Sequence, residues 1–156
     1  MTFLATQSPP ATADEGPLEN DGWFPDIDMQ ALRKTARLDG TVTPERLRHA
    51  RQMAVMSVNS ELGSWADLQR QAGHASLLDV PATQLGQKSW LELCYLRAVY
   101  SAVQADLVEA YRNQDTTGAG DKKADAMEPK ADEYRRNMRW AISDMLGIRR
   151  TTVELI

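Results

Sequence analysis

Apolar residues recur every three or four positions over three long stretches of this chain, and this period most constrains its fold. Such spacing places the apolar side chains on one face of an α-helix. In the last stretch the steps alternate between four and three along Met127, Ala131, Tyr134, Met138, Ala141 and Met145. An earlier stretch follows Leu47, Ala50, Ala54, Val58, Leu62, Trp65 and Leu68. These patterns predict an all-α protein, a small bundle of about four helices.

Signals for the start of a short first helix lie near Asp28. Asp28 is an N-cap candidate, because its carboxylate can accept hydrogen bonds from the free backbone N–H groups of a first helical turn. Ile27 and Leu32 stand at the spacing of a hydrophobic staple across that cap. Gly40 is expected to end this helix.

The start of the second helix is equally well defined. Thr43 is expected to cap it, and Pro44 takes the first helical position, where a missing N–H loses no hydrogen bond. The helix is expected to end by Gly73. Gly63 is a candidate for a break or bend within it, because glycine costs about 1 kcal/mol relative to alanine inside a helix.

The third helix has the clearest start signal, since Ser89 and Glu92 form the pattern of a capping box. From Trp90 to about Tyr111 it is apolar on two faces. One face holds Leu91, Cys94, Ala98, Ala102 and Ala105, and the other holds Leu93, Leu96, Val99, Val103 and Leu107. A helix this apolar lies at the centre of a domain or buries its second face against another subunit. The sequence leaves both arrangements open.

Prolines and glycines limit the remaining elements. Pro129 is expected near the start of the fourth helix, because a position deeper inside would cost about 3 kcal/mol. Gly147 is expected to end that helix. Residues 74–88 contain Pro81 and Gly86 and are expected to form a loop without regular structure.

The formal net charge of −4 comes entirely from the first 22 residues of the chain. This segment has no basic residue, and its acidic residues are Asp14, Glu15, Glu19 and Asp21. Because it is rich in proline and has little to bury, residues 1–22 are predicted to be a disordered acidic arm. The remaining residues are formally neutral, which does not favour sequence-independent nucleic-acid binding through clustered Lys and Arg.

Glycines followed by lysines in Thr116–Asp125 raise the question of a phosphate-binding loop. A P-loop requires GxxxxGK[ST] between a strand and a helix. Here Gly120 is followed by Asp121, and neither of the two lysines that come next precedes a Ser or Thr. The segment is better interpreted as a flexible connection between two helices.

The sequence contains no catalytic or metal-binding pattern. It lacks HExxH, CxxC and GxSxG motifs, and His49 and His74 are its only histidines. Cys94, the single cysteine, is interpreted as a core residue, and no apolar run of 18 residues is present. We therefore predict a non-enzymatic protein without cofactor, metal or membrane contact. The methionines on helical stripes are interpreted first as core residues and second as adaptable partner contacts: Met53, Met56, Met127, Met138 and Met145.

The carboxyl-terminal residues 149–156 form a short segment with an apolar end. Val153, Leu155 and Ile156 alternate as in an extended strand. The segment is interpreted as a docking tail that adds to an exposed strand edge on a partner, or as a frayed terminus. The helical domain between arm and tail is expected to span residues 23–148.

Six segments in unbroken order resemble the head completion proteins, called L, of P-two-like contractile-tailed phages. They extend from about Phe24 to the carboxyl terminus and read FPDID, TVTPERLRHA, LLDVPATQL, LRAVYSAVQADLVEAYR, GAGDKKADA and RRNMRWAI. A single one of these segments would not be diagnostic, but six in this order and spacing are specific. The resemblance does not include the amino-terminal arm.

The resemblance implies a structural protein of the virion, located at the head-to-tail neck and assembled in the host cytoplasm. Members of this family join the portal vertex after DNA packaging. They are similar to helical adaptor proteins that form a ring, commonly of twelve subunits, beneath the portal. The implied partners are the portal protein, identical subunits, and a tail or tail-terminator protein. Such a ring retains DNA in the head and offers a surface for tail attachment.

Two sets of residues are candidate contact sites under this resemblance. The candidate partner-binding residues are Arg149, Arg150, Val153, Leu155 and Ile156. The candidate channel loop, whose lysines would contact packaged DNA without sequence specificity, contains Gly118, Gly120, Lys122 and Lys123. The alternative function is that of a small helical regulator that binds nucleic acid, which would need a basic recognition face.

Overall fold

The computed structural model describes residues 16–38, 42–112 and 118–149, with residues 111–112 and 118–129 described by their backbone alone. Its elements are α1 (Met29–Ala36), α2 (Pro44–Gln71), the 3-10 helix η1 (Leu77–Asp79), β1 (Gln84–Leu85), β2 (Lys88–Ser89), α3 (Trp90–Arg112) and α4 (Gly118–Met145). Four α-helices, one 3-10 helix and one two-stranded ribbon thus make up the regular structure of these ranges. The predicted all-α fold class is confirmed.

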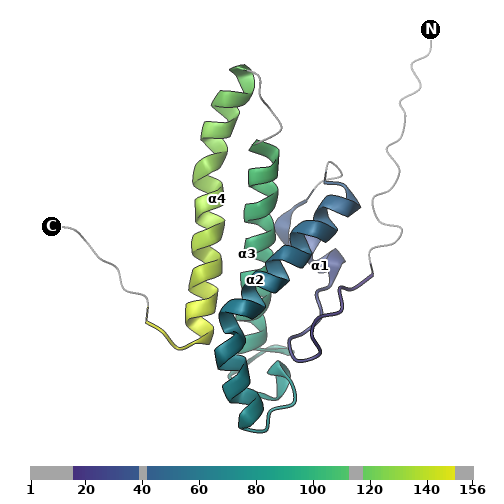
Figure 1. The fold of residues 1–156 in the computed structure, drawn as a ribbon, viewed down its shortest axis with the longest axis vertical. Coiled ribbons are helices and arrows are strands. Elements are labelled where there is room, and N and C mark those ends of the chain that lie inside the picture. The colour runs from purple at the N-terminus through teal and green to yellow at the C-terminus, as the bar shows by residue number, and fades with distance from the viewer. Residues whose placement is uncertain (1–15, 39–41, 113–117, 150–156) are drawn as a thin grey trace, which may run out of the picture.

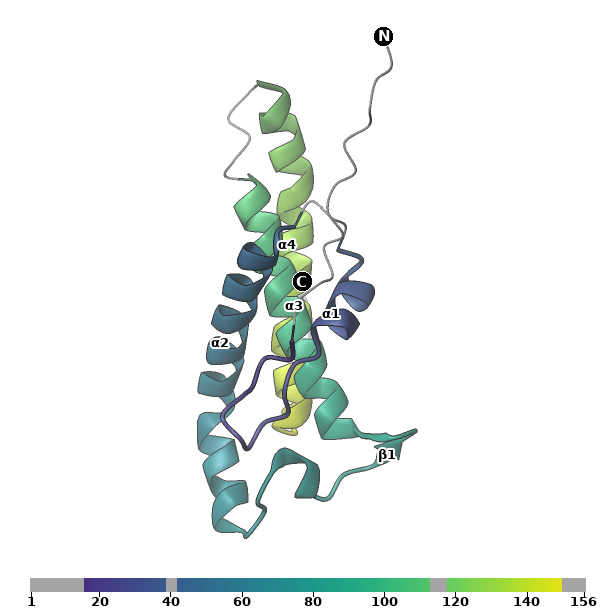
Figure 2. The same cartoon turned by 90° about the vertical axis from the view of Figure 1, so that its right-hand side faces the viewer.

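Helix α3 lies at the centre of the fold. It runs antiparallel beside α4, while α2 crosses it on another side (Figure 1). Helix α1 also packs on α3, as the turned view in Figure 2 makes clear. The residues of both apolar faces of α3 are buried or half-buried within the chain. Of the two arrangements that the sequence left open, the central position is the one adopted.

An aromatic cluster joins the segment before α1 to the helices. Trp23 packs edge-on against Phe24 and Trp65, with ring centroids 4.8 and 5.9 Å apart. Phe24 in turn stacks on Tyr95 of α3 at 4.8 Å. Tyr95 is fully buried, and this burial raises the pKa of its hydroxyl above the ordinary value. The hydroxyl is therefore a neutral hydrogen-bond donor inside the core.

The predicted helix caps are confirmed. The carboxylate of Asp28 accepts hydrogen bonds from the backbone N–H groups of the second and third residues of α1, at 2.8 and 3.1 Å. The Thr43 hydroxyl accepts from Arg46 N at 3.4 Å, with Pro44 at the first position of α2. The Ser89 hydroxyl accepts from Glu92 N at 3.1 Å. The structure thus shows one of the two bonds of the predicted capping box, and the Glu92 carboxylate forms an ion pair with Lys88.

Helix α1 ends earlier than predicted. Its last residue is Ala36, and Arg37 adopts a left-handed conformation with φ of 50°. Leu38 N then donates to the carbonyl oxygen of Arg33 at 3.1 Å, which satisfies a free carbonyl at the helix end. The expected terminator, Gly40, lies outside the described residues. An arginine in the left-handed conformation therefore ends this helix, where the sequence suggested a glycine.

Helix α2 is continuous through Gly63, so the suggested break is absent from this described helix. The predicted stripe is buried from Leu47 to Leu62, Trp65 is half-buried, and Leu68 is 61% exposed. A Cβ atom built on Gly63 would meet no atom within 4 Å. The helix therefore tolerates this glycine, and its packing does not require it.

Gly63→Ala should raise the free energy of unfolding by about 1 kcal/mol, because alanine is the better helix former and finds open space here. Urea unfolding followed by circular dichroism measures this change. Gly73→Ala is the matched control, since Gly73 has a φ of 95° and an alanine there would be strained. Destabilisation by Gly63→Ala would contradict the open environment described for this position.

Helix α4 begins earlier than predicted. It starts at Gly118, so Pro129 lies well inside the helix and not near its start. The residues before the proline are mostly strong helix formers such as alanine, lysine and glutamate. Their preference outweighs the two glycines and the hydrogen bond that a proline cannot donate. The helix ends at Met145, with Gly147 at a φ of 68° as predicted for its terminator.

A short hairpin replaces part of the loop expected over residues 74–88. Strands β1 and β2 pair antiparallel, with Leu85 opposite Lys88. The turn between them consists of Gly86 and Gln87, and Gly86 has a φ of 66° that favours glycine. With two residues in each strand, the hairpin is too short for a readable alternation of polar and apolar residues.

Residues 18–22, here called the strap, belong to the folded unit and not to a disordered arm. Leu18 and Ile27 exchange two backbone hydrogen bonds of 3.1 and 3.2 Å. The Asn20 side chain joins a partly buried hydrogen-bond network with Asn59 and the buried Tyr95. The predicted boundary at residue 22 is therefore too late.

Asp21 fixes the end of the strap. Its carboxylate accepts hydrogen bonds from Trp23 N and Phe24 N at 3.0 and 2.9 Å. The same carboxylate pairs with Arg70 of α2 at 3.2 Å. Arg70 also lies over the Trp23 ring, 5.0 Å from its centroid. These partners are far from the strap in sequence or lie in irregular structure, which is why composition predicted disorder.

Candidate assembly surface

Two methionines leave apolar surface exposed on the outer side of α2. Met53 is 48% exposed and Met56 is 66% exposed, whereas Ala54 and Val58 face inward and are buried. Core packing was the first interpretation of these methionines, and it is wrong for both. Helix α2 turns its other side to α3, so the outer side stays uncovered. Methionine is well suited to adaptable contacts with another protein, which was the second interpretation.

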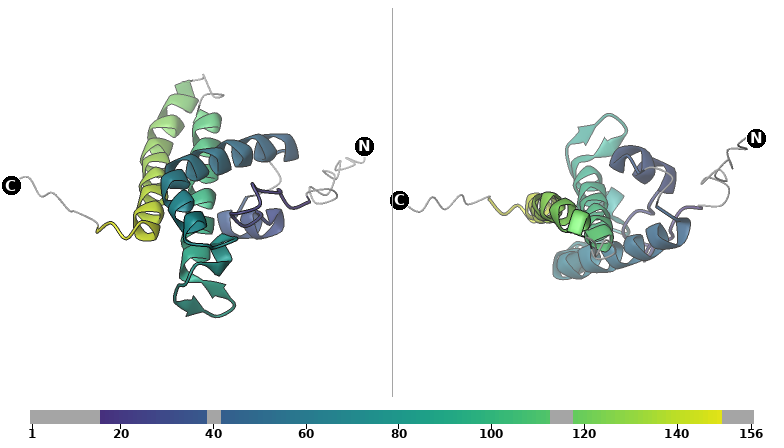
Figure 3. Two further views of the ribbon diagram at one scale, coloured as in Figure 1. Left: turned by 60° about the horizontal axis from the view of Figure 1, so that its bottom comes forward. Right: turned by 90° about the horizontal axis from the view of Figure 1, so that it is seen from above.

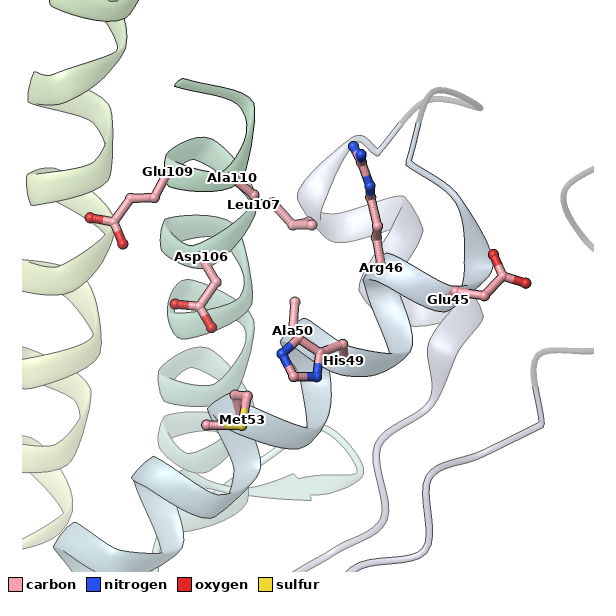
Figure 4. Close-up of a pocket in the computed structure, with 9 residues that line it drawn as sticks. All are labelled: Glu45, Arg46, His49, Ala50, Met53, Asp106, Leu107, Glu109 and Ala110. Carbon is pink, nitrogen blue, oxygen red and sulfur yellow. The ribbon is translucent and has the colours of Figure 1, made fainter. Parts of the chain in front are cut away.

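A groove lies beside Met53, between α2 and α3. We call it the α2 groove; its volume is about 440 Å³. Its buried floor includes Ala50 and Leu107, and Met53 forms part of its wall. Figure 4 shows the side chains of His49 and Asp106 on facing sides of this space. The groove therefore combines an apolar floor with a polar rim.

Two further grooves adjoin the same methionine. One lies between the strap and α2, where Leu18, Val55 and Met56 are among its lining residues. The other lies where α2, α3 and α4 meet and includes Met138 and Arg139. Because Met53 lines all three grooves, the outer side of α2 is a continuous uneven surface and not a single isolated side chain.

The rim of the α2 groove carries more carboxylates than cations. Its charged residues are Glu45, Asp106, Glu109 and Arg46, together with His49. Glu109 forms an ion pair with Arg135 of α4. Partial burial raises the pKa of the Asp106 carboxyl, while Arg135 and His49 act in the opposite direction. A cationic side chain from another molecule would therefore be favoured at this rim.

The described residues contain neither a candidate metal site nor a helix that could span a membrane. No group of three or more His, Cys, Asp or Glu side chains in the described ranges could hold a metal ion. No helix within those ranges is long and apolar enough to cross a membrane. Cys94 is buried, as expected for a core residue.

The structure places the predicted site residues only in part. Arg149 is exposed after the end of α4. The other candidate partner-binding residues, Arg150, Val153, Leu155 and Ile156, lie outside the described residues. The candidate channel residues Gly118, Gly120, Lys122 and Lys123 belong to the first turns of α4. The interpretation of these four residues as a loop is therefore wrong, and their contact with DNA stays a prediction.

Sequence reasoning missed the exposed apolar residues of the hairpin region. Leu85 is 67% exposed and Trp90 is 45% exposed. The glycine at position 86 was read as a loop signal, although Gly-Gln between two short apolar-containing runs is also compatible with a two-residue turn. A propensity for turn formation does not reveal which side chains stay outside the core.

The fold and its surface define a small helical protein whose distinctive features are exposed apolar side chains and the grooves beside them. The profile of the phage head completion protein (GPL) family matches residues 18–156, and the chain belongs to this family. The match includes the strap, so the resemblance begins earlier than the sequence segments indicated. The family role is the structural one of completing the phage head.

One relative extends this assignment over nearly the whole chain. The chain is 38% identical over 148 residues to the head completion/stabilization protein of Escherichia phage P2. The alignment includes 95% of this chain and 88% of that relative. No solved structure matches the chain.

Proposed function

We propose that the chain completes the head at the portal vertex, where identical subunits form a ring beneath the portal after DNA packaging. The ring retains DNA and offers the surface to which the tail or a tail-terminator protein attaches. Membership of the head completion family supports this proposal, and so does the name of the phage P2 relative, which includes stabilization. A ring of twelve subunits is the number that we expect.

The observation that carries the proposal is the exposed outer side of α2. Exposed apolar residues that line grooves are typical of protein contact sites, whereas single scattered ones are not. Met53 and Met56 lie one helical turn apart, and three grooves adjoin Met53. A neighbouring subunit or the portal protein would cover this surface in the completed head.

A ring of identical subunits requires two different surfaces on each copy. In a head-to-tail contact, one surface of each copy binds the other surface of its neighbour. The chain of copies closes into a ring when the rotation from one copy to the next is a whole fraction of 360°. The outer side of α2 supplies one such surface. The carboxyl-terminal residues 149–156 remain a proposed docking segment for the portal or tail protein, with Arg149 as their described start.

Met53→Asp should lower the yield of DNA-filled, nuclease-resistant heads at least about tenfold when this variant replaces the unaltered chain in the phage. A carboxylate at this position would be desolvated without a partner if a second protein covers it. The measurement compares nuclease-protected DNA per particle and counts of filled heads.

Ser64→Asp is the matched control, because it adds the same charge at an exposed position of α2 that lines none of the three grooves. It should leave head yield unchanged. Both variants should unfold at the same temperature as the unaltered chain, since neither position is buried. Equal head yields for the two variants would contradict the proposed function of the α2 surface.

A further inference from the structure

The β1–β2 hairpin projects from the domain and carries two large exposed apolar side chains. Leu85 lies in β1 next to the turn, and Trp90 directly follows β2. Both are substantially exposed, and tryptophan is a residue type enriched at the centres of protein interfaces. Residues 83–90 are here called the apolar hairpin.

The register of the strands explains why these side chains point outward. Side chains alternate between the two faces of a strand, and directly paired residues share a face. Gln84 is exposed, but its partner Ser89 is buried and marks the face of the ribbon that is turned toward the domain. Leu85 and its partner Lys88 therefore face away from it. Trp90, the first residue of α3, directly follows Ser89 and is 45% exposed, and its backbone N–H donates to Thr83 O at 2.8 Å.

The apolar hairpin and α2 lie on opposite sides of α3. Figure 2 shows α2 along one side of the molecule and the hairpin projecting from the other. The view from above in Figure 3 shows the same separation. A projecting apolar element on one side and a groove on the other are the two different surfaces that a head-to-tail contact joins.

We propose that the apolar hairpin of one copy inserts into the α2 groove of a neighbouring copy. This inference rests on the proposed function, because it names the contact by which identical subunits would form their ring. Leu85 and Trp90 would cover Met53 and the apolar floor at Ala50 and Leu107. Both partners in this contact are present once in every copy, so the contact can be repeated from subunit to subunit.

Charge also favours this pairing. The outward face of the apolar hairpin carries the cation Lys88 beside Leu85, and Lys88 is half-exposed although it contacts Glu92. The rim of the α2 groove carries an excess of carboxylates, among them Asp106 and Glu45. A cation beside the inserted apolar residues would thus approach the acidic rim, which fixes the orientation of the contact.

A disulfide test in assembled heads examines this contact. The full-length chain carrying both Leu85→Cys and Met53→Cys replaces the unaltered chain, and purified DNA-filled heads are oxidised and run on a non-reducing gel. Each copy would then have one thiol in the hairpin and one in the groove. The expected result is a ladder of covalent multimers larger than dimers, which disappears on reduction.

The control pair is Leu85→Cys with Leu68→Cys, because Leu68 is a similarly exposed residue of α2 that does not line the groove. This pair and each single variant should give no ladder, and the single variants also account for the buried native Cys94. Heads that contain the Leu85→Cys/Met53→Cys chain but give no ladder would overturn the inference. A ladder of equal strength from the control pair would overturn it as well.

The composition of the heads separates failure of this inference from failure of the proposed function. Immunoblotting for the unaltered chain in completed heads tests whether the protein stays at the vertex at all. Its absence there would contradict the proposed function and remove the basis for a ring. Its presence, together with a missing ladder from the test pair, would contradict the hairpin contact alone.

Discussion

Tyr95→Phe should lower the free energy of unfolding by about 1–3 kcal/mol, although only one oxygen atom is removed. The Tyr95 hydroxyl accepts from Asn20 Nδ2 and donates to Asn59 Oδ1, both at 2.7 Å. Asn59 Nδ2 then donates to Asn20 Oδ1 at 2.9 Å and closes the network. Loss of the hydroxyl would leave two partly buried amide groups with incomplete hydrogen bonding, which is costlier than the bond itself.

Tyr95→Ala separates the ring from the hydroxyl and should cost about 3–5 kcal/mol. The ring is fully buried and stacks on Phe24, so its removal leaves a cavity beneath the segment that precedes α1. Urea unfolding measures both variants. Tyr134→Phe is the control, because Tyr134 is a half-buried tyrosine of α4 outside this network, and its change should stay within about 0.5 kcal/mol. An equally small effect of Tyr95→Phe would mean that the two amides are satisfied by water.

The helix starts could be predicted from the sequence because capping is local chemistry. Asp28, Thr43 and Ser89 each accept a hydrogen bond from an N–H within three residues, so neighbouring letters contain the whole interaction. The predicted start of α4 was wrong because two sequence signals disagreed. Pro129 argued for a late start, and the helix formers before it outweighed that single penalty.

The strap could not be predicted because its partners are remote. Asn20 bonds to a residue 75 positions away, and Asp21 pairs with one 49 positions away. Composition shows only that residues 1–22 have too few apolar side chains to form a core by themselves. It does not show that the folded helices provide polar partners for Asn20 and Asp21. A segment with few apolar residues can thus be ordered by a partly buried hydrogen-bond network.

The candidate surface was visible in the sequence only as residue types. Periodicity identified Met53 and Met56 as helical, but both stripes of an amphipathic helix look alike until its neighbours are placed. The crossing of α2 over α3 decides that Val58 is buried and Met56 is not. Exposure of Leu85 could not be predicted for a different reason, since a two-residue strand is too short to show an alternation.

Deletion of residues 1–22 should lower the free energy of unfolding by at least about 2 kcal/mol. The deletion removes Asn20 from the Tyr95 network and removes the carboxylate that accepts from Trp23 N and Phe24 N. It also removes the backbone pairing of Leu18 with Ile27. The chain entropy regained by freeing the strap offsets part of this loss, so the net effect is smaller than the sum of the broken bonds.

Deletion of residues 1–15 is the matched control, because it leaves every contact of the strap in place. It should change stability by less than about 0.5 kcal/mol, while the longer deletion should lower the melting temperature by several degrees. Thermal unfolding of the two truncated chains beside the unaltered one measures the difference. If the two truncated chains were equally stable, the strap would contribute nothing to the stability of the fold. Because Asn20 and Asp21 hold the aromatic cluster from one side, we expect the strap, residues 18–22, to account for nearly the whole difference.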